Sequence, residues 1–220
     1  MKILVLDLHT GDAFKDSRIS DALNKYTTAS SLRLLYSDFS YGDLASYDAI
    51  VLTGSNNMKI YSDAKTRELR HHLKRLSSNG VNVLGICGGN QVLASTFSCY
   101  RYRLPEPEVG WHSIRITEIG RKDPLFKGLK DCFMAFESHI LAVRCDDRAK
   151  VFAENEHCTQ TILYHPSVRG VQFHPEVFPK SRLESLRTKI RGATAETSSR
   201  AAECEGSQIF RNFVDIVKTA

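Results

Sequence analysis

An α/β fold, in which crossover helices connect parallel strands, is the architecture that the sequence predicts. Short apolar runs alternate with amphipathic stretches through the first hundred residues, as expected for such strands and helices. Between two of these runs, Leu69, Leu73 and Leu76 recur at helical spacing, which gives one apolar stripe able to pack against a sheet. The runs expected to form buried strands are 3–6, 32–35, 49–52 and 81–86.

The rest of the chain is expected to add strands and two closing helices. A short helix should end near Cys99, and Pro105 and Pro107 then predict a loop, because proline cannot continue a helix. The small and polar residues between the closing helices predict a mobile surface connection over 192–206. Further strands, some of them antiparallel, are expected at 114–117, 133–136, 151–153, 161–164 and 170–173, and the closing helices around 183–190 and 209–217.

Length and composition fit one water-soluble domain that comprises all 220 residues. No apolar run reaches membrane-spanning length, and residues 3–6 are too short for a signal-peptide core, so a cytoplasmic protein without a membrane partner is expected. The net charge of +5 is dispersed except for one basic cluster, which we interpret as a solvated helix face, and no nucleic-acid-binding motif accompanies it. The cluster comprises Lys180, Arg182, Arg187, Lys189 and Arg191.

The six cysteines are widely spread and contain no Cys-x-x-Cys pair. This spacing argues against a zinc site and gives no disulfide framework, so most of them are expected to be reduced, buried, small apolar residues. Neither a metal nor an organic cofactor is implied. The cysteines are Cys87, Cys99, Cys132, Cys145, Cys158 and Cys204.

Cys87 follows the apolar run 81–86 and precedes two glycines and helix-compatible residues, an arrangement that resembles a nucleophile elbow. Such a turn lifts a reactive side chain out at the carboxyl end of a strand, where open α/β sheets place their binding crevices. The exposed N–H groups of a helix N-terminus favour a thiolate, and the N–H of Gly88 can hydrogen-bond an oxyanion. Taken alone, Cys87 is also explained as an apolar residue at a tight turn.

The segment 170–176 supplies candidate partners for this thiol. Pro175 favours extended backbone at His174, so His174 and Glu176 should project to the same face. A carboxylate beside an imidazole holds the required tautomer, while the imidazole deprotonates the cysteine and later protonates the leaving amine. Alone, this segment is also explained as the end of a strand. The two segments together favour a catalytic triad of Cys87, His174 and Glu176.

Both segments resemble the class I glutamine amidotransferases, whose signature couples Gly-x-Cys-x-Gly-x-Gln to a later Gly-x-Gln-Phe-His-Pro-Glu. The residues 52–55 are similar to the family loop that supplies the second oxyanion-hole N–H, which assigns Gly54 and Gly88 to the oxyanion hole. The resemblance implies a doubly wound, flavodoxin-like fold with a mostly parallel central sheet, helices on both faces and additional antiparallel strands. It also implies a γ-glutamyl thioester on Cys87 and release of ammonia from glutamine.

By the same resemblance, Gln91 should help to hold the substrate glutamine. Ser138 and His139 match the position where relatives bind the α-amino and carboxylate groups of glutamine, although His139 is equally open to a structural role. The chain departs from the family pattern at Asn90, where a histidine is common, and around residues 97–107. These departures concern pocket shape and partner docking rather than the triad.

The chain contains no phosphate-binding Gly-x-x-x-x-Gly-Lys-Ser/Thr loop and no room for a synthase site, so any acceptor chemistry is expected on another polypeptide. Three functions stay open. The first is a glutaminase subunit that delivers ammonia to a separate synthase, as in guanylate synthase. The second is a self-sufficient hydrolase or transferase that acts on γ-glutamyl compounds. The third is a regulatory module without turnover, against which the intact triad argues.

Overall fold

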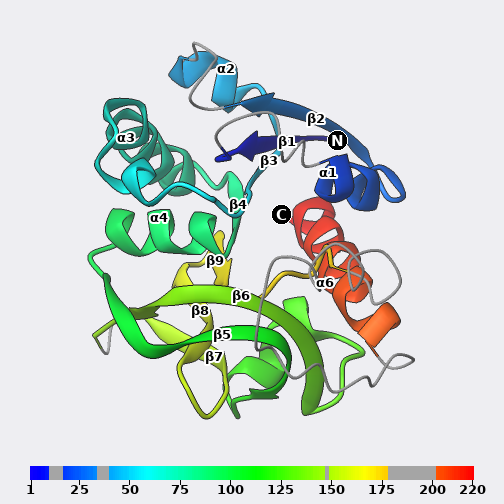
Figure 1. The fold of residues 1–220 in the computed structure, drawn as a ribbon. Coiled ribbons are helices and arrows are strands. Elements are labelled where there is room, and N and C mark those ends of the chain that lie inside the picture. Colours follow the sequence, from blue (N-terminus) through cyan, green and yellow to red (C-terminus); the bar gives the residue numbers. More distant parts are fainter. Residues whose placement is uncertain (10–16, 34–39, 147–148, 178–201) are drawn as a thin grey trace.

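Nine strands form a single sheet in the computed structural model of the chain, which describes residues 1–9, 17–33, 40–146, 149–177 and 202–220 (Figure 1). The strands are β1 (Lys2–Asp7), β2 (Thr28–Arg33), β3 (Ala49–Leu52), β4 (Asn82–Ile86), β5 (Tyr100–Ile116), β6 (Cys132–Arg144), β7 (Lys150–Glu154), β8 (Thr159–His165) and β9 (Val168–Val171). The helices are α1 (Ser17–Asn24), α2 (Tyr41–Ala45), α3 (Ala64–Ser78), α4 (Gly88–Thr96) and α6 (Ala202–Thr219), with short 3₁₀ helices η2 (Met58–Ser62), η3 (Gly120–Lys122) and η4 (Pro124–Phe126).

The strands lie in the order β2-β1-β3-β4-β9-β8-β7-β5-β6. From β2 to β9 the neighbouring strands are parallel, and from β9 onward they are antiparallel. All the parallel strands therefore end at one edge of the sheet, which is where α/β proteins place their sites. This topology confirms the expected α/β fold with a parallel centre and additional antiparallel strands.

Helices cover both faces of the parallel part of the sheet (Figure 1). In β1, Ile3 and Val5 belong to the apolar cluster that contains residues of α1 and α6. Leu4 and Leu6 belong to the opposite cluster, which contains residues of α2, α3 and α4. Because successive side chains of a strand point to opposite faces, a strand covered on both sides has to be apolar at every position. The unbroken apolar run that predicted β1 has this cause.

The predicted strands β1, β3 and β4 and the predicted helix α3 are present. The second strand was placed wrongly, because β2 spans Thr28–Arg33 rather than residues 32–35. β2 lies at the edge of the sheet and pairs with β1 from Lys2 opposite Thr28 to Asp7 opposite Arg33. Its Thr-Ala-Ser-Ser stretch is too polar to be recognised as a strand, since an edge strand does not need apolar residues throughout.

The loop predicted at Pro105 and Pro107 is wrong, because both prolines lie inside the long strand β5. β5 and β6 form an antiparallel ribbon whose register shifts between Arg103 and Glu108, on either side of the two prolines. Proline has no N–H to donate to a ladder and is tolerated in strands at such irregularities. The ladder is thus interrupted where the prolines lie and resumes on both sides.

A disulfide joins Cys99 to Cys145, which contradicts the expectation that the cysteines give no disulfide framework. The two residues are 46 positions apart, and their Cα atoms are 4.5 Å apart. They meet because Tyr100 pairs with Arg144 at the adjoining end of the β5–β6 ribbon. This pairing brings the residues just outside the ribbon together, and sequence spacing does not reveal it.

A buried ion pair connects β9 to the segment before η4. The guanidinium of Arg169 donates to both carboxylate oxygens of Asp123, with Nε to Oδ1 at 3.0 Å and Nη2 to Oδ2 at 2.9 Å. Both side chains are more than nine-tenths buried. Two parallel charge-assisted hydrogen bonds of this kind orient both groups strongly.

The end of the chain corrects the predicted connection over 192–206, because α6 begins at Ala202 and its first residues are helical. The remainder of that connection, the predicted helix 183–190 and the basic cluster lie outside the described residues. α6 confirms the closing helix expected around 209–217. Among the described residues, no helix combines the length and the apolar character that a membrane crossing requires.

Candidate active site

Cys87 lies between the end of β4 and the start of α4. Its backbone has φ 47° and ψ −102°, which is a strained conformation for a residue with a side chain. Two hydrogen bonds hold this turn: the N–H of Cys87 donates to the carbonyl of Val171 (2.8 Å), and that of Gly89 donates to the carbonyl of Thr53 (2.9 Å). The geometry is that of a nucleophile elbow, with Cys87 at the N-terminus of α4.

The loop after β3 packs directly against this turn. A Cβ added to Gly88 would lie 2.7 Å from the backbone nitrogen of Ser55, so no other residue fits here without a shift of the backbone. A Cβ added to Gly54 would lie 3.2 Å from Cε1 of His174 and 3.8 Å from Cβ of Cys87. The structure therefore brings the two glycines assigned to the oxyanion hole together with Cys87 and His174.

His174 and Glu176 meet through a contact of 2.6 Å between Nδ1 of His174 and Oε1 of Glu176. Their side chains are 13% and 4% exposed. The backbone is not extended as expected, because β9 ends at Val171 and residues 175 and 176 form a turn. The N–H of His174 donates to the carbonyl of Phe136 in β6 (2.8 Å), which fixes the turn against the sheet. The two side chains thus meet across a turn and not along a strand.

The electrostatics of this pair favour an imidazolium. Burial alone lowers the pKa of His174, but the charge of Glu176 and the contact with Cys87 outweigh burial and hold the pKa well above its ordinary value. Burial likewise acts to raise the pKa of Glu176, and the charge and hydrogen bond of His174 outweigh that effect and lower it. A positive imidazole beside Cys87 is the arrangement that stabilises a thiolate nucleophile.

Gln91 is buried, and protein groups hold both ends of its amide. Its Nε2 donates to the carbonyl of Leu141 in β6 (2.8 Å), and its Oε1 accepts from the hydroxyl of Tyr61 in η2. Gln91 therefore ties α4 to β6 and to η2. An effect of Gln91 on a bound substrate would pass through the positions of these two elements.

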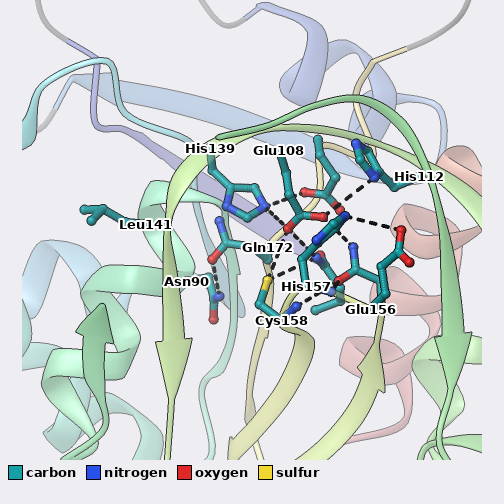
Figure 2. A network of polar contacts seen from close by, with 12 residues as sticks. Asn90, Glu108, His112, His139, Leu141, Glu156, His157, Cys158 and Gln172 are labelled. Atoms are coloured by element: carbon teal, nitrogen blue, oxygen red, sulfur yellow. Dashed lines mark hydrogen bonds and ion pairs between the residues drawn. The ribbon is translucent and has the colours of Figure 1, made fainter. Parts of the chain in front are cut away.

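Ser138 and His139 point to opposite faces of β6. Ser138 is exposed, whereas the side chain of His139 is only 2% exposed. Nε2 of His139 lies 3.1 Å from Oε2 of Glu108 and 3.0 Å from Oε2 of Glu137 (Figure 2). The side chain of His139 therefore contacts buried carboxylates, which corresponds to the structural alternative, while Ser138 stays on the open face.

The charges in this buried group are strongly coupled. Burial raises the pKa of Glu137 to about 7. Burial acts to lower the pKa of His139, but the contacts with Glu108 and Glu137 outweigh it and raise the pKa to about 10. The contact with His139, together with further hydrogen bonds, outweighs burial at Glu108 and lowers its pKa to about 2.

A second carboxylate–imidazole pair, to which the sequence led us to assign no role, lies beside the site. Nδ1 of His9 is 2.7 Å from Oδ1 of Asp7, and a Cβ added to Gly54 would lie 3.9 Å from Nε2 of His9. Asp7 is the last residue of β1, which is the parallel neighbour of β3. Polar residues at the carboxyl end of the strand next to the one that leads to Gly54 were the signal that could have revealed this pair.

A sequence model of the family described as "Glutamine amidotransferase class-I" matches residues 12–190. One subunit of the glutamine-hydrolyzing GMP synthase of Sulfolobus acidocaldarius is 30% identical over 143 residues, which are 64% of this chain and 73% of that protein. The GMP synthase of Clostridium novyi is 30% identical over 157 residues, 68% of this chain and 29% of that protein. The GMP synthase subunit of the same name from Pyrococcus abyssi is 32% identical over 125 residues, 54% of this chain and 65% of that protein. This chain thus covers less than two thirds of the length of the Clostridium and Pyrococcus proteins.

Two solved structures have the same fold as this chain. A glutamine amidotransferase from Thermotoga maritima superposes with a TM-score of 0.79 at 18% identity and covers 99% of this chain and 98% of its own. A protein from Thermoplasma acidophilum, described as a putative GMP synthase subunit, superposes with a TM-score of 0.76 at 22% identity and covers 100% of this chain and 94% of its own.

Proposed function

Because the chain belongs to the class-I glutamine amidotransferase family, we propose that it hydrolyses the side-chain amide of glutamine and delivers the ammonia to a separate synthase. The observation that carries this proposal is the convergence of three separate segments on one point. Cys87 sits in a strained turn at a helix N-terminus, Gly54 packs against it, and His174 is held there by Glu176. This set of groups is what thioester chemistry requires.

In the first half-reaction, Sγ of Cys87 attacks the side-chain carbonyl carbon of glutamine. Nδ1 of His174 is bound to Glu176, so Nε2 is the nitrogen left to take the thiol proton. The backbone N–H groups of Gly54 and Gly88 would stabilise the oxyanion. Collapse of the tetrahedral intermediate breaks the carbon–nitrogen bond, and the imidazolium donates its proton to the leaving ammonia.

In the second half-reaction, water replaces ammonia. The imidazole of His174 takes a proton from the water as the oxygen attacks the γ-glutamyl thioester, and the carbon–sulfur bond then breaks. Sγ of Cys87 recovers its proton, and glutamate leaves. The net change is the conversion of glutamine and water into glutamate and ammonia.

The names of the relatives bear on the proposed acceptor. Two of the similar proteins are named as one subunit of a glutamine-hydrolyzing GMP synthase, which makes a separate synthase chain the kind of partner to expect here. Ammonia released into water at neutral pH becomes protonated and loses its nucleophilicity, so a synthase would have to dock where it can receive ammonia directly. We therefore propose a complex in which the acceptor chemistry lies on the partner.

The catalytic part of the proposal is tested by glutamate release from glutamine. We expect Cys87→Ser to lower kcat/KM roughly 10³-fold or more, because the nucleophile is lost. Cys132→Ser is the matched control, since Cys132 is a free but exposed cysteine, and it should retain the wild-type rate. Equal rates for the two variants would refute the assignment of Cys87.

The partner is tested separately, with the purified chain and the synthase component of a two-chain GMP synthase. Glutamate release that rises when the synthase and its substrates are added supports delivery of ammonia. Rapid cleavage of γ-glutamyl peptides by the chain alone, with no response to the synthase, would instead establish the γ-glutamyl hydrolase alternative.

A further inference from the structure

Four side chains with metal-binding atoms meet on the side of β6 opposite to Ser138. They are Glu108 of β5, Glu137 and His139 of β6, and Cys158, which immediately precedes β8. All four residues are more than nine-tenths buried. Glu108 and His139 lie directly opposite each other in the β5–β6 ladder, so the register of the ribbon brings them together. Cys158 reaches them from the turn between β7 and β8.

The ligand-type atoms of this group lie close to one another (Figure 2). Nε2 of His139 is 3.1 Å from Oε2 of Glu108 and 3.0 Å from Oε2 of Glu137, and Sγ of Cys158 is 3.2 Å from the same oxygen of Glu108. The atoms contributed by Glu108, His139 and Cys158 all lie within 4.8 Å of one another. One point in space is therefore within reach of a nitrogen, a sulfur and two carboxylate oxygens.

The hydrogen bonding of this group is incomplete. Neither oxygen of Glu137 and neither ring nitrogen of His139 makes a hydrogen bond of good geometry, although all four atoms are buried. The single hydrogen or lone pair on Nε2 of His139 cannot be directed at both carboxylates at once. Native proteins rarely leave such groups unsatisfied, because burying them without a partner is costly. A cation between these side chains would supply the missing partner for the atoms that face it.

We propose that Glu108, Glu137, His139 and Cys158 bind a divalent cation of the zinc type. Imidazole, thiolate and carboxylate are the ligands that zinc takes in proteins, usually four of them in a tetrahedron. Bond lengths of about 2.0–2.3 Å place the ligand atoms of such a tetrahedron about 3.3–3.7 Å apart. The observed spacing of 3.0–3.2 Å therefore needs to open by only a few tenths of an ångström.

Two amides hold these ligands from outside. Nε2 of Gln160 lies 3.4 Å from Sγ of Cys158 and 3.3 Å from Oε2 of Glu108. Nδ2 of Asn155 donates to Oε1, the other oxygen of Glu108 (2.6 Å). Partners that orient metal ligands in this way are a regular part of metal sites, and they fix which carboxylate oxygen faces the ion.

A second group of potential ligands leads from the buried site to the surface. Glu108 belongs to this group as well, together with His112 and His157. The side chains of His112 and His157 are 25% and 45% exposed, and Nδ1 of His112 lies 3.7 Å from Oε1 of Glu108. A cation captured by these two histidines can pass along Glu108 to the buried ligands, so the site has an entry path.

The ion would connect β5, β6 and the turn between β7 and β8. β6 also carries Ser138 on its open face and supplies the carbonyl of Leu141 that binds Gln91. A metal at this place would act on the neighbouring active site by holding β6 in position. The proposal is independent of the chemistry proposed for Cys87.

The test uses the full chain with Cys87→Ser, which removes the catalytic thiolate as a competing metal ligand. We expect this protein to retain about one equivalent of zinc after dialysis, measured by elemental analysis. Cobalt should give a thiolate-to-metal charge-transfer band together with the strong visible bands of a tetrahedral site. Failure of this parent protein to retain zinc or to show the thiolate band overturns the proposal, whatever any further variant does.

The site is assigned by adding a second substitution to Cys87→Ser. Cys158→Ser should abolish the charge-transfer band and weaken zinc binding roughly 10- to 100-fold or more, whereas Cys132→Ser at the exposed cysteine should change neither. Glu137→Gln, which keeps the shape of the side chain, should weaken zinc binding without removing the thiolate band, and circular dichroism checks that each variant is folded. A band that survives Cys158→Ser would overturn the assignment.

Discussion

Replacing Glu176 with glutamine tests whether the carboxylate behind His174 has the role proposed for it. The substitution keeps the volume of the side chain and removes its charge. The contact with Nδ1 of His174 is 2.6 Å, and both side chains are largely buried, so solvent screens the pair only weakly. Removing one charge from such a pair costs about 3–5 kcal/mol. If that energy is used in the transition state, kcat/KM for glutamine falls about 10²–10⁴-fold.

The pH profile of Glu176→Gln gives a second, independent readout. Because the pKa of His174 is raised in the folded protein, its charged form and the interactions that depend on it are present below the pKa of free histidine. They are lost as the pH rises through the raised value. Loss of the Glu176 charge lowers that pKa, so the alkaline limb of the kcat/KM profile should move to lower pH.

The assay is glutamate release from glutamine across the pH range, with Glu154→Gln as the control. Glu154 is an exposed carboxylate that pairs with a surface arginine, so this exchange tests the chemical change without touching the site. A Glu176→Gln variant that keeps kcat/KM within about twofold of the control, with an unmoved alkaline limb, would refute the reasoning.

Three further outcomes are expected. Gly88→Ala should lower kcat/KM roughly 10²–10³-fold with little loss of substrate binding, because the new methyl group would lie 2.7 Å from the backbone nitrogen of Ser55 and displace an oxyanion donor; steady-state kinetics check this. Exchange of both Cys99 and Cys145 for serine should lower the free energy of unfolding by about 2–4 kcal/mol, and a reductant should then have no further effect on urea denaturation. Asp123→Ala should lower that free energy by about 3–5 kcal/mol, because it leaves a buried guanidinium without its partner, and a loss below about 1 kcal/mol would contradict this.

The central strands were predictable because their signal is local. Buried parallel strands such as β3 and β4 are apolar at nearly every position, and the run is visible without knowledge of its neighbours. β2 and β5 lack that signal. β2 is a polar edge strand, and β5 contains Pro105 and Pro107 at an irregularity that only its pairing with β6 explains.

Of the candidate site, the elbow at Cys87 was predictable because its strand, cysteine and glycines are contiguous in the sequence. His174 and Glu176 were identified together, but for a geometric reason that the structure does not support, since a turn and not a strand brings them into contact. The pair of Asp7 and His9 was missed, because its place beside the site depends on the order of β1 and β3 in the sheet.

The sequence by itself determined which side chains can carry the proposed chemistry and on what kind of fold, since those signals are local motifs and periodicities. The tertiary structure alone decided which distant residues meet. The Cys99–Cys145 disulfide and the contacts of Glu108, His139 and Cys158 all depend on how β5, β6 and the β7–β8 turn are placed. The physical reason is that strand register is set by packing over the whole sheet, and residues that it brings together carry no common mark in the sequence.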